Sequence, residues 1–352
     1  MTRSHALVLV LLPFSAACSN SATHGPSSDR ADARAGTSED AGPACHGKTG
    51  VPRENTTTVM EAGAPDGGLR SALVHVPASY DPAKPTMLVL NFHGLLELAS
   101  LQASVSHMSD TSDQRGFIVA YPEGLAVGVG LSWNAGTCCG NTLNDVGFIR
   151  DLVKKLEDDY CIDPKRVFAT GLSNGAMLSY RLGCEAADIF AAVAPVAGAV
   201  VIDPCTPSRP VPILAIHGTG DTVVPFNGGT DGLYHVLDFP PVSYSIELWR
   251  HLDGCPDSPA PDMAASAPMP DESTPDGGPS DSLFTGSMLV SQKGDSACHA
   301  WTGCKQESEV ELCTVVDGGH SWPGGPPLVG KSSKDIDATE TVIDFFEKHP
   351  MP

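Results

Sequence analysis

Short apolar runs alternate with segments of helical pattern along most of this chain. The apolar runs lie at 86–92, 116–122, 166–171, 191–198, 211–218 and 309–319, and apolar side chains recur at helical spacing near 149–160, 177–182 and 336–346. This alternation predicts an α/β fold, in which a mainly parallel, doubly wound sheet carries helices on both faces. Ligands of such sheets bind beyond the carboxyl ends of the strands, so the loops after the runs are candidate site loops.

One of these loops contains a serine between two glycines, in the segment GLSNGAMLSY that begins at Gly171. A strand, a turn flanked by Gly171 and Gly175, and then a helix form the context of a nucleophile elbow. Side chains at the two glycines would collide with the neighbouring strand or helix. The turn places the Ser173 hydroxyl at a helix N-terminus, where backbone N–H groups favour developing negative charge. Ser173 is therefore the candidate nucleophile.

A serine nucleophile needs a histidine base and an acid that orients the base. In proteins with this elbow the order along the chain is serine, acid, histidine. Asp221 follows an apolar run in the segment HGTGDTVVP, and His320 follows the last run in VVDGGHSWPGG. Both loops fall at the sheet edge where Ser173 lies, so we predict a triad of Ser173, Asp221 and His320.

Two other histidines are rival bases. His217 lies at the end of a strand and is expected to be structural, and His93 precedes the serine in the chain. His93 belongs to the segment NFHGLLE, whose HG step follows an early strand, where this kind of fold places its second oxyanion donor. We assign the two donors to the backbone N–H groups of Leu95 and Asn174. The alternative is that Gly94 merely permits a tight turn.

The N-terminus has the pattern of an export signal. A short basic start is followed by an apolar stretch from Ala6 to about Phe14 and by small residues that end in Cys18. We interpret residues 1–18 as a signal peptide with a lipobox-like end, too short to span a membrane. Cys18 would then be lipidated; cleavage followed by secretion is the alternative. The expected location is the outer membrane, as a lipoprotein, or the extracellular space.

Composition divides the rest of the chain. Residues 19–44 contain almost no large apolar residue and predict a disordered tether. Residues 45–350 are expected to form a single catalytic domain, interrupted at about 256–282 by a polar stretch that we interpret as a surface insertion; a lid is the alternative. The net charge of −21 argues against a nucleic-acid partner, because phosphate binding needs a basic face.

The cysteines indicate an oxidising compartment. Of the 11 cysteines, ten remain once Cys18 is set aside, and these can pair as five disulfides in an exported chain. A zinc site is weakly supported, because no CxxC pair recurs. The histidines near cysteines, His46 and His299, do not repeat at a ligand spacing.

Several segments together resemble the polyhydroxybutyrate depolymerase and feruloyl esterase group of α/β-hydrolases, over about residues 45–348. The segments are NFHG, SWNAGTCCG, VGFIRDLV, YCIDPKRVFATGLSNGAMLSYRLGCEAADIFAAVAPVAG, HGTGDTVVP and GGHSWPG. The resemblance implies an α/β-hydrolase fold and a secreted serine esterase without a metal or organic cofactor. It also implies that Trp133 and Trp322 line the substrate cleft; the alternative is that each is a core or rim tryptophan. By the same resemblance Cys255 pairs with Cys304, which leaves Cys298 to pair with Cys313.

The function expected is hydrolysis of carboxylic esters through an acyl-enzyme. The substrate is an ester, polymeric or not: a hydroxyalkanoate polyester, or feruloyl or acetyl esters of plant-wall polysaccharide. Two alternatives are a non-catalytic surface binding or adhesion domain on a hydrolase scaffold, and a peptidase with the same triad. We expect a monomer whose contact with a membrane is limited to a lipid on Cys18.

Overall fold

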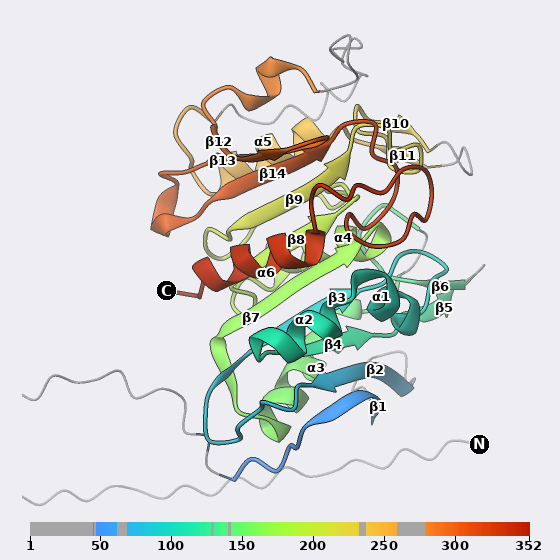
Figure 1. Cartoon of the computed structure of the whole chain (residues 1–352), viewed down its shortest axis with the longest axis vertical. Helices are drawn as coiled ribbons and strands as arrows, with labels where there is room; N and C mark the ends of the chain where they lie inside the picture. The colour runs from blue at the N-terminus through green and yellow to red at the C-terminus, as the bar shows by residue number, and fades with distance from the viewer. Residues whose placement is uncertain are drawn as a thin grey trace, which may run out of the picture. The chain divides into compact units, whose positions relative to one another are not determined.

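A ten-stranded sheet runs through the part of the chain that the structure describes (Figure 1). The structure is a computed structural model that describes residues 45, 47–61, 69–127, 130–139, 142–231, 237–258 and 279–352. The strand order is β1-β2-β4-β3-β7-β8-β9-β14-β13-β12. The six strands from β4 to β14 in this order are parallel, which confirms the expected α/β sheet.

The elements follow one another along the chain in the order that the apolar pattern predicts. The strands of the large sheet are β1 (Arg53–Glu61), β2 (Leu69–Val76), β3 (Thr86–Phe92), β4 (Ile118–Pro122), β7 (Ile162–Leu172), β8 (Ala192–Val196), β9 (Ile213–Gly218), β12 (Met288–Lys293), β13 (Ser296–Trp301) and β14 (Val310–Val315). The helices are α1 (Ala99–Ser106), α2 (Met108–Arg115), α3 (Asp145–Asp159), α4 (Asn174–Glu185), α5 (Val242–Leu252) and α6 (Ala338–Lys348). Short pieces complete the set: β5 (Leu125–Val127) with β6 (Gly130–Ser132), β10 (Gly229–Thr230) with β11 (Asp238–Phe239), and the 3-10 turns Asp281–Phe284 and Lys305–Glu307.

Both edges of the sheet are antiparallel, which the apolar runs did not predict. On one side β2 pairs antiparallel with β4 and with β1, and on the other β13 pairs antiparallel with β14 and with β12. The central strands are buried on both faces and form continuous apolar runs, whereas β12 is exposed along its whole length. Its apolar residues, Met288, Leu289 and Val290, form only a short run and are exposed, so the pattern of a buried strand does not mark it.

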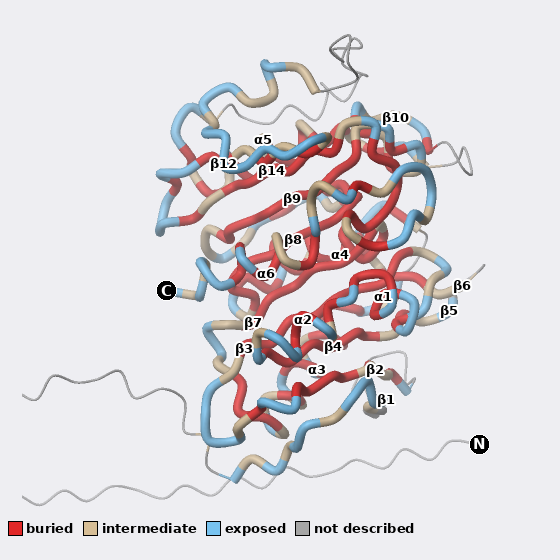
Figure 2. The backbone as a smooth tube through the Cα atoms, viewed as in Figure 1, coloured by how far each residue is buried: buried red, intermediate tan, exposed pale blue. Residues whose placement is uncertain are grey.

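Helices cover both faces of the sheet, as expected. Helices α1, α2 and α6 pack on one face, and α3, α4 and α5 pack on the other (Figure 1). The strands between the two layers are buried along most of their length (Figure 2). Their carboxyl ends therefore carry the loops that are free to build a site.

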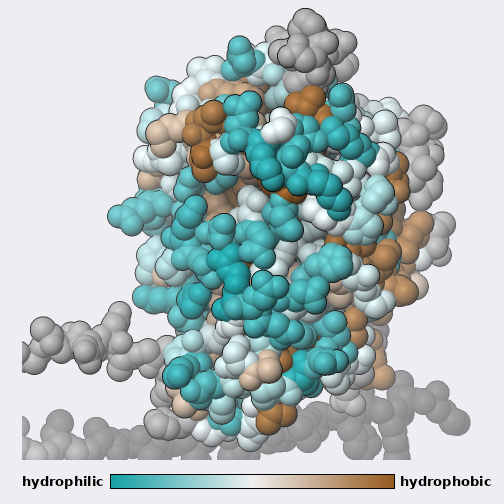
Figure 3. All heavy atoms as spheres, in the orientation of Figure 1, coloured by the Kyte–Doolittle hydropathy of each residue, from teal (hydrophilic) through white to brown (hydrophobic). Residues whose placement is uncertain are grey.

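The face that carries α2 and α6 is largely hydrophilic (Figure 3). An ion-pair cluster joins the two helices there: the guanidinium of Arg115 lies 3.1 Å from Glu340, 2.7 Å from Asp344 and 2.6 Å from Glu347. These partners are substantially exposed, so the cluster contributes little net stability.

Five disulfides join cysteines in the described part of the chain: Cys45–Cys161, Cys138–Cys139, Cys184–Cys205, Cys255–Cys304 and Cys298–Cys313. The last two confirm the pairing that the family resemblance implied. Cys255–Cys304 closes the chain on either side of the polar stretch at about 256–282, and Cys298–Cys313 ties β13 to β14.

The signal peptide at 1–18, with Cys18, and the tether at 19–44 lie outside the described residues, as does most of the stretch at 256–282. None of the helices within the described ranges has the length and apolar character needed to cross a bilayer.

Candidate active site

Ser173 occupies a strained turn between β7 and the first residue of α4. Its backbone has φ 58° and ψ −119°, in a region that residues other than glycine rarely adopt. The turn is held on both sides: the Ser173 N–H donates to the Val196 carbonyl at 3.0 Å, and the Ser173 carbonyl accepts from Met177 N–H at 2.9 Å. Such a conformation costs roughly 1–3 kcal/mol and persists only where the surroundings enforce it.

The two flanking glycines are required by close packing. A Cβ added at Gly175 would lie 2.3 Å from the Phe92 carbonyl oxygen, and one at Gly171 would lie 2.7 Å from the same atom. The end of β3 therefore presses directly against the turn. This confirms the expected collision with a neighbouring strand.

His320 and Asp221 form a hydrogen-bonded pair although they are 99 residues apart. The His320 Nδ1–H donates to Asp221 Oδ2 at 2.8 Å, which leaves Nε2 as the acceptor nitrogen of the ring. The two loops are joined by the Gly220 N–H, which donates to the Gly318 carbonyl at 2.9 Å. His320 is fixed further by Val329, whose N–H donates to its carbonyl at 3.1 Å.

Asp221 is buried and yet stays ionised. Burial alone would raise the pKa of its carboxyl, but the hydrogen bond from His320 and the charges of His320 and His217 hold that pKa below its usual value. The other carboxylate oxygen accepts from the backbone N–H groups of Val223 and Val224 at 2.8 and 2.9 Å. Both oxygens of the buried Asp221 carboxylate thus accept hydrogen bonds, and the anion can orient an imidazole and stabilise its cation.

The rival histidines are engaged in other contacts. The His217 ring lies 3.5 Å from Asp221 but donates from Nε2 to the Val224 carbonyl at 2.9 Å, and burial lowers its pKa. His93 donates from Nδ1 to the Gly94 carbonyl at 2.7 Å and accepts at Nε2 from Gly124 N–H at 2.9 Å. Burial lowers the pKa of His93 to about 4, so the ring is neutral at ordinary pH. Both rings support loops.

Two backbone N–H groups beside Ser173 have no partner within the described part of the chain: those of Leu95 and Asn174. The neighbouring amides are used, because Gly94 N–H donates to Glu97 Oε2 at 2.9 Å and Leu96 N–H donates to the Leu131 carbonyl at 2.8 Å. Leu95 and Asn174 both line the pocket that contains Ser173. The two predicted oxyanion donors thus belong to residues that line the same pocket as the serine.

A pocket of about 130 Å³ brings these groups together, and it is lined by both Ser173 and His320. The candidate nucleophile, base and oxyanion residues share this lining with Glu97 and the buried acid Asp231. The remaining lining is largely apolar, and we call it the apolar wall: Cys138, Cys139, Met177, Val223, Val224, Leu237, Phe239 and Val329. The arrangement can offer a nucleophile, a base and N–H donors within a largely apolar pocket.

Glu97 lines this pocket and was not predicted from the sequence. Burial raises the pKa of its carboxyl, while the Gly94 N–H and the nearby His320 act to lower it. Its hydrogen bond to Gly94 fixes the turn that presents the Leu95 N–H. The only signal in the sequence was its place three residues after Gly94 in NFHGLLE.

The two tryptophans do not line this pocket as the described residues define it, so their expected place in the cleft is corrected. Trp133 is buried against Phe92 and donates from Nε1 to the His93 carbonyl at 3.0 Å. Trp322 is buried and donates to Thr339 Oγ1 at 3.0 Å, which ties the His320 loop to α6. Both indoles support site loops from within the core, where their N–H groups find partners.

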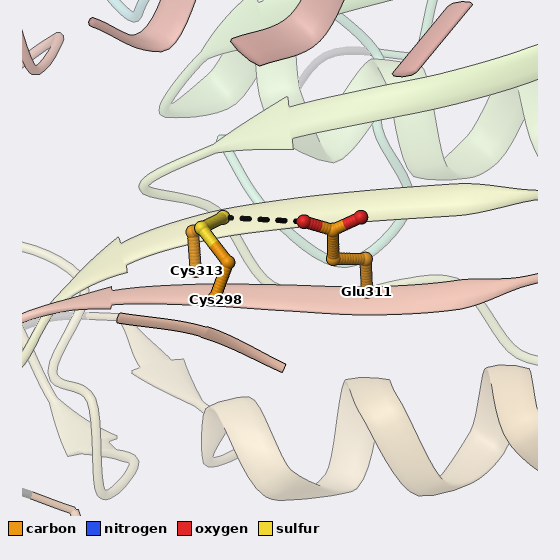
Figure 4. A group of neighbouring side chains, drawn as sticks. All are labelled: Cys298, Glu311 and Cys313. Atoms are coloured by element: carbon orange, nitrogen blue, oxygen red, sulfur yellow. Dashed lines mark hydrogen bonds between the residues drawn. A yellow bond between two sulfur atoms is a disulfide. The ribbon is translucent and has the colours of Figure 1, made fainter. Parts of the chain in front are cut away.

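One group of potential metal ligands occurs among the described residues: Cys298, Glu311 and Cys313 (Figure 4). The two sulfur atoms are bonded to each other, and a Glu311 oxygen lies 3.7 Å from the Cys313 sulfur. A disulfide has no thiolate to offer, so this cluster does not fit zinc while the bond is intact.

Sequence comparison identifies esterases as relatives. No family model matches the chain. Feruloyl esterase B from Piromyces equi is 31% identical over 266 residues, which cover 73% of this chain and 43% of that protein. Feruloyl esterase C from Emericella nidulans is 32% identical over 167 residues, which cover 46% of this chain and 58% of that protein. The chain therefore spans about half the length of these relatives.

Structural comparison agrees on the fold. The acetyl xylan esterase from Aspergillus awamori superposes with a TM-score of 0.51 at 14% sequence identity, over 83% of this chain and 99% of that one. At such low identity the match supports the fold alone. Together with the sequence relatives and the strained serine turn, it leads to one assignment. The chain is a homologue of feruloyl esterases and has the α/β-hydrolase fold.

Proposed function

We propose that this chain is an exported serine esterase that hydrolyses carboxylic esters through an acyl-enzyme, with Ser173, His320 and Asp221 as its triad. The observation that carries the proposal is the His320–Asp221 hydrogen bond of 2.8 Å in a pocket that Ser173 also lines. That bond leaves the Nε2 of His320 free to accept a proton.

In the first step the Ser173 hydroxyl attacks the carbonyl carbon of the ester while His320 Nε2 takes its proton. The electron pair of the carbonyl π bond moves to the oxygen. This oxygen then accepts hydrogen bonds from the N–H groups of Leu95 and Asn174. When that bond reforms, the alcohol leaves with the proton from His320. Water then attacks the acyl-enzyme by the same route and releases the acid and Ser173.

Asp221 acts through His320. It accepts the Nδ1–H and stabilises the imidazolium that forms in each half-reaction. The two backbone N–H groups on its other oxygen, and its lowered pKa, keep it ionised while it does so. Glu97 holds the turn of the first oxyanion donor.

The substrates that the relatives support are feruloyl or acetyl esters of plant-wall polysaccharide, since the matched proteins are named feruloyl and acetyl xylan esterases. A hydroxyalkanoate polyester is the second substrate class. A panel of methyl ferulate, acetylxylan, short p-nitrophenyl esters and polyhydroxybutyrate separates the two classes. Higher kcat/KM on polyhydroxybutyrate than on the other esters would overturn the plant-wall assignment.

Export and anchoring belong to the same proposal. Five disulfides need an oxidising compartment, and Cys18 would carry the lipid. We expect Cys18→Ser to release the protein from membranes or to leave it unprocessed. Mass spectrometry that finds an unmodified N-terminus elsewhere would refute the anchor.

The decisive experiment is Ser173→Ala. We expect kcat to fall by about 10⁶-fold, because loss of the nucleophile disables the whole triad. Labelling by a fluorophosphonate probe should be lost as well, while thermal unfolding stays unchanged. Ser104→Ala, on the exposed side of α1, is the matched control and should behave like the parent. Near-normal turnover of Ser173→Ala would overturn the assignment of the nucleophile, whereas no adduct on the parent would favour the non-catalytic binding domain.

A further inference from the structure

One disulfide differs from the other four in how it is placed along the chain. Cys138 and Cys139 are adjacent, whereas the other four pairs are separated by 116, 21, 49 and 15 residues. In the chain-entropy model a disulfide stabilises by restricting the loop that it closes in the unfolded chain. A bond between neighbours closes no such loop, so global stabilisation does not explain it.

The position of this disulfide suggests a local role. Cys138 and Cys139 both line the pocket of Ser173, and they belong to an apolar cluster with Met177, Val224 and other residues. Cys138 is buried and Cys139 is half-buried, so the bond lies largely within the protein beside the pocket. With Met177, the apolar wall carries three polarisable sulfur atoms, which make favourable contacts with aromatic rings.

The backbone of this segment is held rigidly. Cys139 has φ 70°, and Gly136 has φ 119°, where an added Cβ would lie 2.2 Å from the Val201 carbonyl oxygen. Thr137 donates to that same oxygen from its N–H at 2.9 Å and from its hydroxyl at 3.2 Å. The disulfide directly follows Thr137, whose two hydrogen bonds hold the chain against Val201, so the wall is fixed in place.

We propose that the Cys138–Cys139 disulfide is the specificity-determining wall of the acyl pocket and favours acyl groups that carry one apolar ring over acetyl. The inference rests on the proposed esterase function. A pocket of about 130 Å³ approaches the cavity of about 150 Å³ that holds benzene in a protein core. An acetyl group carries a single methyl, so it gains less apolar contact with this wall than a ring does.

The test compares two esters in two variants. Cys138→Ala/Cys139→Ala removes the sulfur wall, and Cys138→Ser/Cys139→Ser keeps its size but makes it polar. We expect kcat/KM for methyl ferulate to fall by about ten-fold in both variants, mainly through KM, because a lost apolar contact in a pocket has about this effect. For p-nitrophenyl acetate the change should stay below about three-fold. Cys184→Ala/Cys205→Ala, which removes a disulfide outside the pocket lining, is the control and should not alter the ratio.

The fraction of active enzyme in each preparation is measured by titration with a fluorophosphonate probe, and each rate is divided by this fraction. This correction separates a change of specificity from a loss of folded protein. An equal fall on both esters, or no fall on methyl ferulate, would overturn the proposal while the esterase function stands. A parent protein that neither labels nor hydrolyses either ester would instead overturn the esterase function itself.

Discussion

Two buried carboxyl groups associated with neighbouring strands of the sheet have pKa values that are shifted in opposite directions. Asp221 follows β9 and is 4% exposed, and Glu311 lies within β14 and is 7% exposed. Burial is the largest influence on the pKa of each and raises both. The pKa of Asp221 is nevertheless lowered by its hydrogen bond from His320, whereas that of Glu311 is raised to about 7, with Glu309 adding to the rise.

Position along the strand explains the difference. Asp221 lies beyond the end of its strand, where the backbone N–H groups of Val223 and Val224 are free to bind a carboxylate. Glu311 lies within β14, as its second residue, and pairs with Leu214 on β9 and Ala300 on β13, so the neighbouring N–H groups are used in the sheet. An acid becomes useful for catalysis at the carboxyl edge of a parallel sheet, and not within it.

The strongest test of this comparison removes His320, the hydrogen-bond partner that Asp221 has and Glu311 lacks. His320→Ala should lower kcat by about 10⁶-fold, because the base is lost together with the cation that Asp221 stabilises. His217→Ala is the matched control, since that ring also approaches Asp221, at 3.5 Å. Ester hydrolysis by the two variants is compared directly. A larger loss in His217→Ala than in His320→Ala would mean that the base has been misassigned.

The next test neutralises each acid in turn. Asp221→Asn should lower kcat by roughly 10⁴-fold or less, because the amide favours the wrong tautomer of His320 without removing it. Glu311→Gln should leave kcat and KM of the same ester unchanged. Comparable losses in the two variants would show that the two regions are not functionally distinct.

The third test concerns the disulfide that contacts Glu311. Cys298→Ala/Cys313→Ala opens a link between residues 15 apart and should lower the free energy of unfolding by about 3 kcal/mol. Because neither cysteine lines the Ser173 pocket, kcat of the folded fraction should hardly change. Denaturant unfolding and probe-normalised hydrolysis measure the two quantities separately. Loss of turnover without loss of stability would contradict this separation.

The smallest effect is a pH dependence of stability. The folded pKa of Glu311, about 7, lies above its unfolded value, so its contribution to stability is complete below about pH 4 and is lost as the pH rises to about 7. Glu311→Gln removes that loss and should raise the free energy of unfolding at pH 8 by about 2 kcal/mol, with little change at pH 4. Exposed Glu307→Gln is the control. The raised pKa predicts that the free energy of unfolding of the parent falls between pH 4 and pH 7 when it is compared with that of Glu311→Gln. The same pH dependence in both proteins would contradict it.

Much of the site was visible in the sequence because its signals are local. The apolar runs predicted the parallel strands, and the glycines around Ser173 predicted a turn with no room for side chains, which Gly175 shows at 2.3 Å. The order of Ser173, Asp221 and His320 along the chain predicted that three loops would share one edge. Buried strands and tight turns leave such marks because neighbouring residues alone enforce them.

The remaining features were decided by the tertiary structure, because they depend on what distant segments place beside a residue. Nothing near His217 or His93 in the chain shows that their ring nitrogens are engaged elsewhere, and nothing near Trp133 shows that its indole supports the oxyanion segment from the core. The antiparallel edge strand β12 has only a short apolar run and is exposed, so the pattern of a buried strand did not reveal it. The adjacent cysteines were evident as a sequence pair, but only the packing of their segment against Val201 places them in the wall of the Ser173 pocket.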